Sequence, residues 1–184
     1  MQREVKFAGF GGQGILSAGK FLADGALEEG KEVAWVPSYG PEMRGGTAYC
    51  TIVIADHPIG SPVVNTPYDL VAMNRPSLEK FENTTKAGGF ILVNSSLIPD
   101  RVTRTDVHEI LVPCNDIAMK LKNNRAANMV ALGAYVACSG VVSLETIIAH
   151  VPVTFARKPQ FVEANIACIK EGAKIARQAL EKVL

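Results

Sequence analysis

A glycine-rich loop with the spacing G-x-G-x-x-G lies near the start of the chain. It consists of Gly9, Phe10, Gly11, Gly12, Gln13 and Gly14, and it separates a short apolar run from a helical pattern. Glycines allow a tight turn and a close approach of a ligand to the backbone. The unpaired N–H groups at the start of a helix can receive an anion such as phosphate. The loop therefore predicts an anion-binding turn between a strand and a helix.

The acidic residue that accompanies such a loop in dinucleotide-binding proteins is missing. There, an Asp or Glu near the end of the second strand binds the adenosine ribose, whereas residues 33–38 read Val-Ala-Trp-Val-Pro-Ser. Three interpretations stay open: the chain binds NAD or FAD alone, the glycines serve only tight packing, or the loop binds phosphate or a partner's cofactor. The missing acid counts against the first.

A second loop carries the most unusual residues of the chain. It consists of Ser38, Tyr39, Gly40, Pro41, Glu42, Met43, Arg44, Gly45 and Gly46. It follows a predicted strand at the carboxyl end, where ligand crevices form in open α/β sheets, so we expect both loops at one edge of the sheet. Tyr39, Glu42 and Arg44 offer a ring face, a hydrogen-bond acceptor and a bidentate cation. The alternative is a stiff turn with solvated charges.

Short apolar runs alternate with helical patterns along the chain. Strands are predicted at residues 5–8, 32–36, 48–55, 70–73, 90–93 and 108–112, with 59–64 as a hairpin partner of 48–55. Helices are predicted at residues 15–27, 77–86, 116–122, 125–138, 144–150 and 159–182. This alternation predicts a three-layer α/β/α fold with a mostly parallel, Rossmann-like sheet, a β-hairpin and a long C-terminal helix packed on the sheet.

The composition indicates one domain over residues 1–184 with a large apolar core. Apolar residues make up 48% of the chain, and 19 basic residues nearly balance 18 acidic ones. A nucleic-acid-binding protein needs a basic stripe, and a polybasic membrane anchor needs a cationic cluster. No apolar run approaches the roughly 18 residues that span a bilayer, and no signal peptide is visible. We expect a cytoplasmic protein that binds neither nucleic acid nor membrane.

The cysteines and histidines do not form a metal-binding pattern. Cys50, Cys114, Cys138 and Cys168 stand far apart without a C-x-x-C pair, which excludes a local zinc ribbon or iron–sulfur motif. The three histidines lie about 50 and 40 residues apart, with no ligand at suitable spacing. Reduced, buried thiols and no metal site are the expectation.

The two loops together resemble a known protein family. The segment G-F-G-G-Q-G-I followed by S-Y-G-P-E-M-R-G-G-T-A is similar to the gamma subunit, or fused gamma domain, of 2-oxoacid:ferredoxin oxidoreductases. Residues 72–78, 89–97 and 128–133 extend the likeness over nearly the whole chain. The sequence G-P-E-M-R-G-G-T-A is more similar to 2-oxoglutarate-type subunits than to pyruvate-type ones.

The resemblance implies a division of labour within a complex. Such complexes decarboxylate a 2-oxoacid on thiamine diphosphate with magnesium, pass electrons through iron–sulfur clusters to ferredoxin, and release an acyl-CoA. Alpha and beta subunits hold the thiamine cofactor, and a ferredoxin-like delta subunit can hold clusters. This chain lacks the G-D-G and N-N motif for the diphosphate and lacks cluster cysteines. It is therefore expected to bind no cofactor alone and to be inactive in isolation.

The same resemblance places the two loops beside the active-site and CoA region, with the chain packed on the alpha subunit. The residues implied as a cofactor-bordering surface are Gly9, Gly11, Gly12, Gln13, Gly14, Ser38, Tyr39, Gly40, Glu42, Met43, Arg44, Gly45 and Gly46. No catalytic residue is assigned. A stand-alone Rossmann-type nucleotide-binding oxidoreductase and a pure assembly scaffold are the alternatives. Asn74 and Asn94, at the ends of two predicted strands, are read as capping residues in preference to ligand contacts.

Overall fold

The apolar runs of the sequence form the middle of one six-stranded sheet. The computed structural model describes residues 1–38 and 47–181, and its strands run in the order β2-β3-β1-β4-β5-β6. Their bounds are β1 Gln2–Phe10, β2 Glu32–Pro37, β3 Thr47–Ala55, β4 Asp69–Ala72, β5 Phe90–Asn94 and β6 His108–Val112. Strands β1, β4, β5 and β6 pair in parallel, whereas β3 pairs antiparallel with both β1 and β2. Strands β4 and β5 read as continuous apolar runs because helices cover both of their faces.

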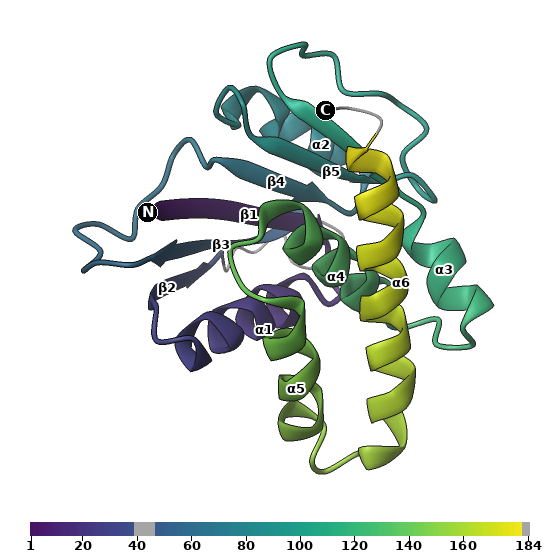
Figure 1. Cartoon of the computed structure of the whole chain (residues 1–184). Coiled ribbons are helices and arrows are strands. Elements are labelled where there is room, and N and C mark those ends of the chain that lie inside the picture. Colours follow the sequence, from purple (N-terminus) through teal and green to yellow (C-terminus); the bar gives the residue numbers. More distant parts are fainter. Residues whose placement is uncertain (39–46, 182–184) are drawn as a thin grey trace.

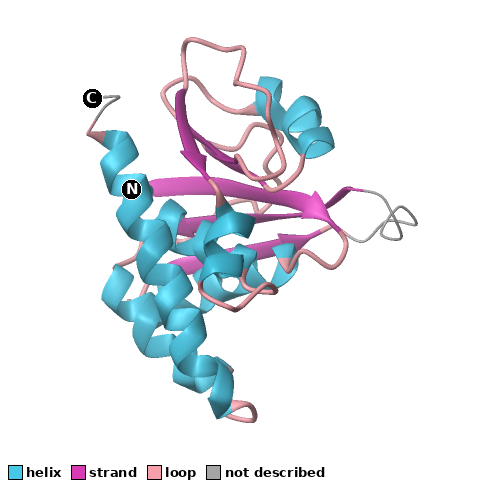
Figure 2. Cartoon of the chain, turned by 90° about the vertical axis from the view of Figure 1, so that its right-hand side faces the viewer, coloured by secondary structure: helices cyan, strands magenta, loops and turns pink. Residues whose placement is uncertain are grey.

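Helices cover the two faces of the sheet unequally. The six α-helices of the described chain are α1 Ile15–Glu28, α2 Arg75–Phe81, α3 Cys114–Lys120, α4 Ala127–Ser139, α5 Leu144–Thr154 and α6 Val162–Leu180. Helices α1, α4, α5 and α6 gather on one side, and α2 lies on the other (Figure 1, Figure 2). The predicted α/β/α fold with its long C-terminal helix is confirmed.

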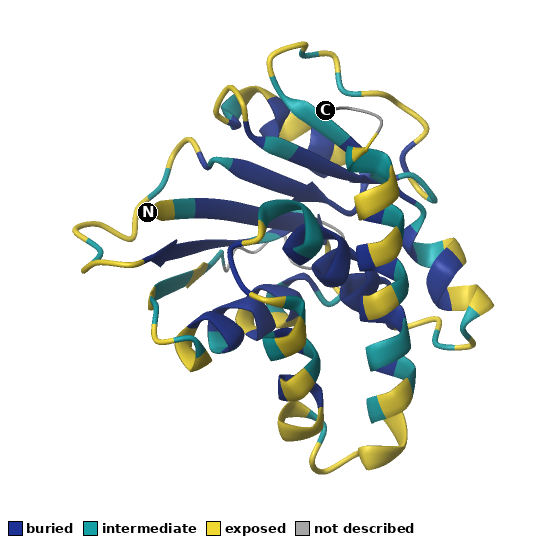
Figure 3. Ribbon diagram, viewed as in Figure 1, coloured by how far each residue is buried: buried dark blue, intermediate teal, exposed yellow. Residues whose placement is uncertain are grey.

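The two layers create two separate apolar clusters. The larger one joins the sheet to α1, α4, α5 and α6, and the smaller one joins β1, β4 and β5 to Leu78 and Phe81 of α2. Helix α4 is buried along nearly its whole length, between the sheet and α6 (Figure 3). The C-terminal helix therefore packs chiefly on α4 and meets the sheet at β6, rather than lying directly across the sheet as expected.

One detail of the predicted sheet was wrong. Residues 59–64 form no strand, and the hairpin consists of β2 and β3. Pro58 directly precedes that segment and Pro62 lies within it, and neither residue can donate to a ladder, which explains the error. Strands β1 and β2, which flank α1 in the sequence, are not neighbours in the sheet. Strand β2 runs in the direction of β1, but the antiparallel β3 lies between them.

A buried ionic group joins distant parts of this fold. The Asp69 side chain is fully buried at the start of β4 and accepts hydrogen bonds from Arg3 Nε at 2.6 Å and Arg3 Nη2 at 3.0 Å. It also accepts from the Tyr135 hydroxyl of α4 at 2.9 Å and from the Phe90 backbone N–H at 2.8 Å. Desolvation and the nearby Asp69 carboxylate raise the pKa of Tyr135 well above its usual value, so the phenol stays protonated and donates.

None of the helices within residues 1–38 and 47–181 is both long and apolar enough to cross a membrane.

Candidate functional site

The glycine loop is held in place by the side chain of Gln13. Its Oε1 accepts a hydrogen bond from Phe10 N at 2.6 Å, which closes the turn, and its Nε2 donates to Met73 O at 3.3 Å, at the end of β4. A Cβ atom at Gly9 would lie 2.6 Å from Gln13 Oε1, so only glycine leaves room for this arrangement. Gln13 therefore fixes the glycine loop to the neighbouring strand β4.

Asn94 continues this network along the carboxyl edge of the sheet. Its Nδ2 donates to Met73 O at 3.2 Å and to Asn115 Oδ1 at 2.8 Å, while its Oδ1 accepts from Cys114 N at 3.1 Å. The ends of β4 and β5 and the start of α3 are thus joined by one buried amide. Side-chain amides that are fully hydrogen-bonded in this way hold an edge rigid.

The polar segments at two strand ends act as caps, as expected. Asn74 Oδ1 accepts from Ser77 N at 2.9 Å and caps α2, with Pro76 in the first turn. Ser96 Oγ accepts from Asp116 N at 3.1 Å in the first turn of α3. These contacts are those of helix-start chemistry.

Helices α1 and α4 begin beside each other, and no side chain caps either start. Gly14 precedes α1 in the left-handed region, with φ 73°, and its carbonyl accepts from Asn128 Nδ2 of α4 at 3.1 Å. A Cβ atom at Gly14 would lie 2.4 Å from the same Nδ2, so glycine is required here for two reasons. Uncapped N–H groups at the two helix starts give this region a positive potential.

Two adjoining cavities open beside these helix starts. The first, of about 360 Å³, is lined by Gly12, Gln13, Asn115, Asn124, Arg125 and Ala127. The second, of about 510 Å³, shares Asn124 and Arg125 and adds Gly14, Lys122, Lys158 and the rings of Phe155 and Phe161 among others. Three cations and no carboxylate are present among the described residues that line the pair. The arrangement suits a ligand with phosphate or carboxylate groups.

Lys122 adopts a backbone conformation that usually belongs to glycine. It follows α3 with φ 56°, and it is the one non-glycine residue of the described chain with positive φ. Its N–H donates to Met119 O and the Asn123 N–H donates to Ala118 O, both at 2.9 Å, which together form a Schellman motif. A side chain at this position costs stability, by about 1 kcal/mol. Strain of this kind is found at functional sites, and Lys122 lines the second cavity.

The structure brings together only part of the predicted bordering surface. Gly12 and Gln13 line the first cavity and Gly14 lines the second, whereas Gly9 is buried beneath the turn and Gly11 lines neither. Ser38 lines a different cavity, over the strand face of β1 and β3. The remaining residues of the second loop, Tyr39, Gly40, Glu42, Met43, Arg44, Gly45 and Gly46, lie outside the described residues.

The flanks of that second loop do lie at the expected edge. Strand β1 ends at Phe10, which pairs with Thr47, and β2 ends at Pro37, which pairs with Cys50. Ser38 and Thr47 therefore stand at the same edge of the sheet as the glycine loop.

Sequence reasoning missed the residues that give the cavities their charge. Asn115, Lys122, Asn124, Arg125 and Lys158 come from the ends of α3, α4 and α6, more than 100 residues beyond the glycine loop. The one local signal is the run Lys122-Asn-Asn-Arg125, which precedes an apolar helix without a Ser, Thr or Asp cap.

The thiols of the chain are poorly suited to nucleophilic chemistry. Burial raises the pKa of Cys50 and Cys138 to about 12 and that of Cys168 to about 11, and it raises the pKa of Cys114 further. Within residues 1–38 and 47–181, no three His, Cys, Asp or Glu side chains are grouped as metal ligands would be.

Comparison with known proteins gives one consistent family. A family model described as "Pyruvate ferredoxin/flavodoxin oxidoreductase" matches residues 4–175. The ketoisovalerate oxidoreductase subunit VorA of Methanothermobacter thermautotrophicus is 42% identical over 179 residues, covering 96% of this chain and 37% of VorA. The chain thus spans little more than a third of the length of that relative.

Two further proteins are similar over their whole length. The 2-oxoglutarate synthase subunit KorC of Methanocaldococcus jannaschii is 34% identical over 181 residues, covering 97% of this chain and 96% of KorC. The crystal structure of a keto/oxoacid ferredoxin oxidoreductase gamma subunit from Geobacter sulfurreducens has 31% sequence identity and a TM-score of 0.85, covering 97% of this chain and 98% of that chain.

Proposed function

The chain belongs to the pyruvate ferredoxin/flavodoxin oxidoreductase family, as a gamma subunit of the 2-oxoacid:ferredoxin oxidoreductase type, and from this premise we propose how it acts. It packs on an alpha subunit as one gamma domain over residues 1–184, and it forms a wall of the active-site and CoA region. The assembled complex, with beta and cluster-bearing subunits, oxidises a 2-oxoacid to an acyl-CoA and reduces ferredoxin.

One observation carries this proposal: the glycine loop and Arg125 line the same cavity, beside two uncapped helix starts. A polyanionic cofactor such as CoA fits this donor set, because phosphates bind to arginine, lysine and backbone N–H groups. CoA supplies the thiol that accepts the acyl group. In this proposal Arg125, Lys122 and the loop N–H groups bind and orient its phosphates, and Gln13 holds the loop in the receptive shape.

Thiamine diphosphate with magnesium does not fit the described residues of this chain. Magnesium is usually held by one or two carboxylates together with phosphate oxygens, and the lining of both cavities contains no carboxylate. The thiamine cofactor and the clusters are therefore assigned to partner subunits. The reacting carbons would be bound there, and this chain contributes binding and positioning.

The proposed substrate is 2-oxoglutarate, on the basis of the G-P-E-M-R-G-G-T-A segment. A branched-chain 2-oxoacid is the second candidate, favoured by the higher identity to the ketoisovalerate subunit VorA than to KorC. Purified complex assayed with 2-oxoglutarate, 2-oxoisovalerate and pyruvate at equal concentrations distinguishes them. A kcat/KM for 2-oxoisovalerate above that for 2-oxoglutarate would reverse the assignment.

Replacing Arg125 by alanine in the assembled complex is expected to raise the KM for CoA about tenfold or more, since charge-assisted hydrogen bonds contribute about 1.5–3 kcal/mol. The KM for the 2-oxoacid should change little. Lys170→Ala, which removes an exposed charge of α6 outside both cavities, is the control. Arg44→Ala tests the second loop in the same assay. If both arginine variants assemble and keep unchanged CoA and 2-oxoacid kinetics, the chain is a scaffold.

Lys122→Gly is expected to raise the stability of the chain and, at the same time, to weaken the binding of CoA by the complex. Glycine adopts positive φ without steric cost, so the free energy of unfolding in urea should rise by about 1 kcal/mol. The same change removes a cation from the second cavity and should raise the KM for CoA in the complex. A stabilised variant with unchanged KM for CoA would show that Lys122 has no part in binding.

A further inference from the structure

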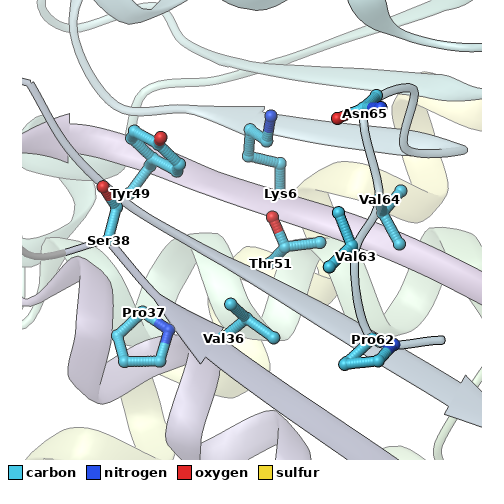
Figure 4. Close-up of a pocket in the computed structure, with 10 residues that line it drawn as sticks. All are labelled: Lys6, Val36, Pro37, Ser38, Tyr49, Thr51, Pro62, Val63, Val64 and Asn65. Atoms are coloured by element: carbon cyan, nitrogen blue, oxygen red, sulfur yellow. The ribbon is translucent and has the colours of Figure 1, made fainter.

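A second cavity region lies on the opposite face of the sheet from α1. Helix α1 covers β2 and β3 on one side, whereas α2 on the other side packs chiefly on β1 and β4. A cavity of about 360 Å³ forms there between the strands and residues 62–65. Lys6, Tyr49 and Thr51 project from the strands toward it, and Val63, Val64 and Asn65 border it from the other side (Figure 4).

Lys6 is buried in this cavity wall, with no counter-ion among residues 1–38 and 47–181. Its residue exposure is 6%, and no acid in the described part of the chain lies within ion-pair distance of its ammonium group. Its neighbours on β1 differ in this respect. Arg3 binds Asp69, and Glu4 accepts from Lys86 Nζ at 2.9 Å. Arg3 and Glu4 of β1 thus have ion-pair partners within the described chain, whereas Lys6 has none there.

The surroundings of Lys6 strengthen the need for an anion. The Nζ atom lies 4.4 Å from the centre of the Phe81 ring and 5.3 Å from that of Tyr49. Lys80 Nζ lies against the same two rings, at 5.4 and 5.7 Å, so a second positive charge is close. Burial, and next the charge of Lys80, lower the pKa of Lys6. Aromatic faces compensate an ammonium group only in part.

Neutral hydrogen-bond donors line the same cavity as the ammonium group. Thr51 is the cross-strand partner of Lys6, is 6% exposed, and forms no side-chain hydrogen bond with any described residue. The amide of Asn65 and the hydroxyl of Ser38 also line the cavity. An ammonium group with adjacent hydroxyl and amide donors is a donor set for oxygen anions.

We propose that this cavity binds a small oxyanion, a carboxylate or phosphate group, with Lys6 as its charge partner and Thr51 as a hydrogen-bond donor. The volume of about 360 Å³ suits a free metabolite of a few carbon atoms or inorganic phosphate. The site is separate from the cavities at the glycine loop, which share no lining residue with it. The proposal of an oxyanion site does not depend on whether the cavities at the glycine loop bind CoA.

The test is the thermal unfolding of the full chain in 10 mM inorganic phosphate or succinate, against chloride at equal ionic strength. For a Kd of about 1 mM, the Tm is expected to rise by about 3–6 °C in at least one of the two anions. Lys6→Met should abolish this rise while leaving the Tm in chloride at or above that of the wild type, because the variant no longer buries an unpaired charge. Lys20→Met, which removes an exposed charge on α1, should keep the full rise.

Thr51→Val is a second variant that preserves strand propensity and shape. It should weaken the apparent affinity for the effective anion about fivefold to tenfold. The proposal is overturned if neither phosphate nor succinate raises the wild-type Tm, or if Lys6→Met keeps the response. It is also overturned if Lys6→Met lowers the Tm in chloride by several degrees, since Lys6 would then have a partner within the chain.

Discussion

Asp69→Asn is expected to lower the free energy of unfolding by about 3–5 kcal/mol, the cost of leaving a buried charge unpaired. The substitution keeps the shape of the side chain but removes the negative charge that Arg3 binds through two nitrogens. It also disturbs the acceptor of the Tyr135 hydroxyl and the Phe90 N–H. Because these residues come from β1, β4, β5 and α4, the loss should affect the whole domain in a single cooperative transition. Urea denaturation followed by circular dichroism measures it.

Two variants calibrate this expectation. Tyr135→Phe removes one hydrogen bond to Asp69 and leaves the ion pair, so it should cost about 1–2 kcal/mol. Asp56→Asn removes an exposed ion pair with the N-terminus and should leave stability close to that of the wild type. If Asp69→Asn lowers the free energy of unfolding by less than about 1 kcal/mol, the contacts of Asp69 with Arg3 and Tyr135 do not hold the sheet to α4.

Gly133→Ala is expected to destabilise the protein by about 3 kcal/mol or more, beyond the usual range for an overpacked core. In an ordinary exposed helix the same change stabilises by about 1 kcal/mol. Here a Cβ atom at Gly133 of α4 would lie 2.0 Å from Ile169 O of α6, and one at Gly172 of α6 would lie 2.0 Å from Val130 O of α4. The two glycines thus let the helix backbones touch reciprocally, and any side chain forces the helices apart.

The effect is checked by urea denaturation of Gly133→Ala and Gly172→Ala beside Gly60→Ala. A Cβ atom at Gly60 meets nothing within 4 Å, so that variant controls for the loss of glycine itself. The two helix variants should lose similar amounts of unfolding free energy. The double variant should lose less than the sum of the two, since either substitution alone already separates the helices. Stability equal to that of Gly60→Ala would contradict the close helix contact.

The elements of the fold were predictable because apolar runs and turn residues mark them. Strand β5, for example, follows Gly88-Gly89 as a continuous apolar run, and Gly30, with φ 73°, follows the C-cap residue Glu29 of α1. The order of strands was not predictable from such signals. The local sequence of β2 does not indicate whether this strand pairs with β1 or forms a hairpin with β3.

The site was predictable only where it is local. The glycine loop is recognisable from six consecutive residues, and its predicted place between a strand and a helix is confirmed. Arg125 and Asn115 join it through the parallel order β1-β4-β5-β6, which brings the ends of these strands and the starts of α3 and α4 together. Lys6 carries no motif at all. Its interest depends on its burial and on the lack of an acid beside it in the described part of the chain, which are properties of the folded protein.

The position of β3 has a consequence for nucleotide specificity. Adjacent strands lie about 4.8 Å apart, so β2 ends about 10 Å from the strand that leads into the glycine loop, with β3 between them. In a dinucleotide-binding sheet these two ends are neighbours, and a ribose can bridge them. An acidic residue engineered at the end of β2 would therefore stand one strand too far away to hold a ribose whose phosphates rest on the loop. The chain is separated from NAD-dependent enzymes by its strand order as well as by its residues.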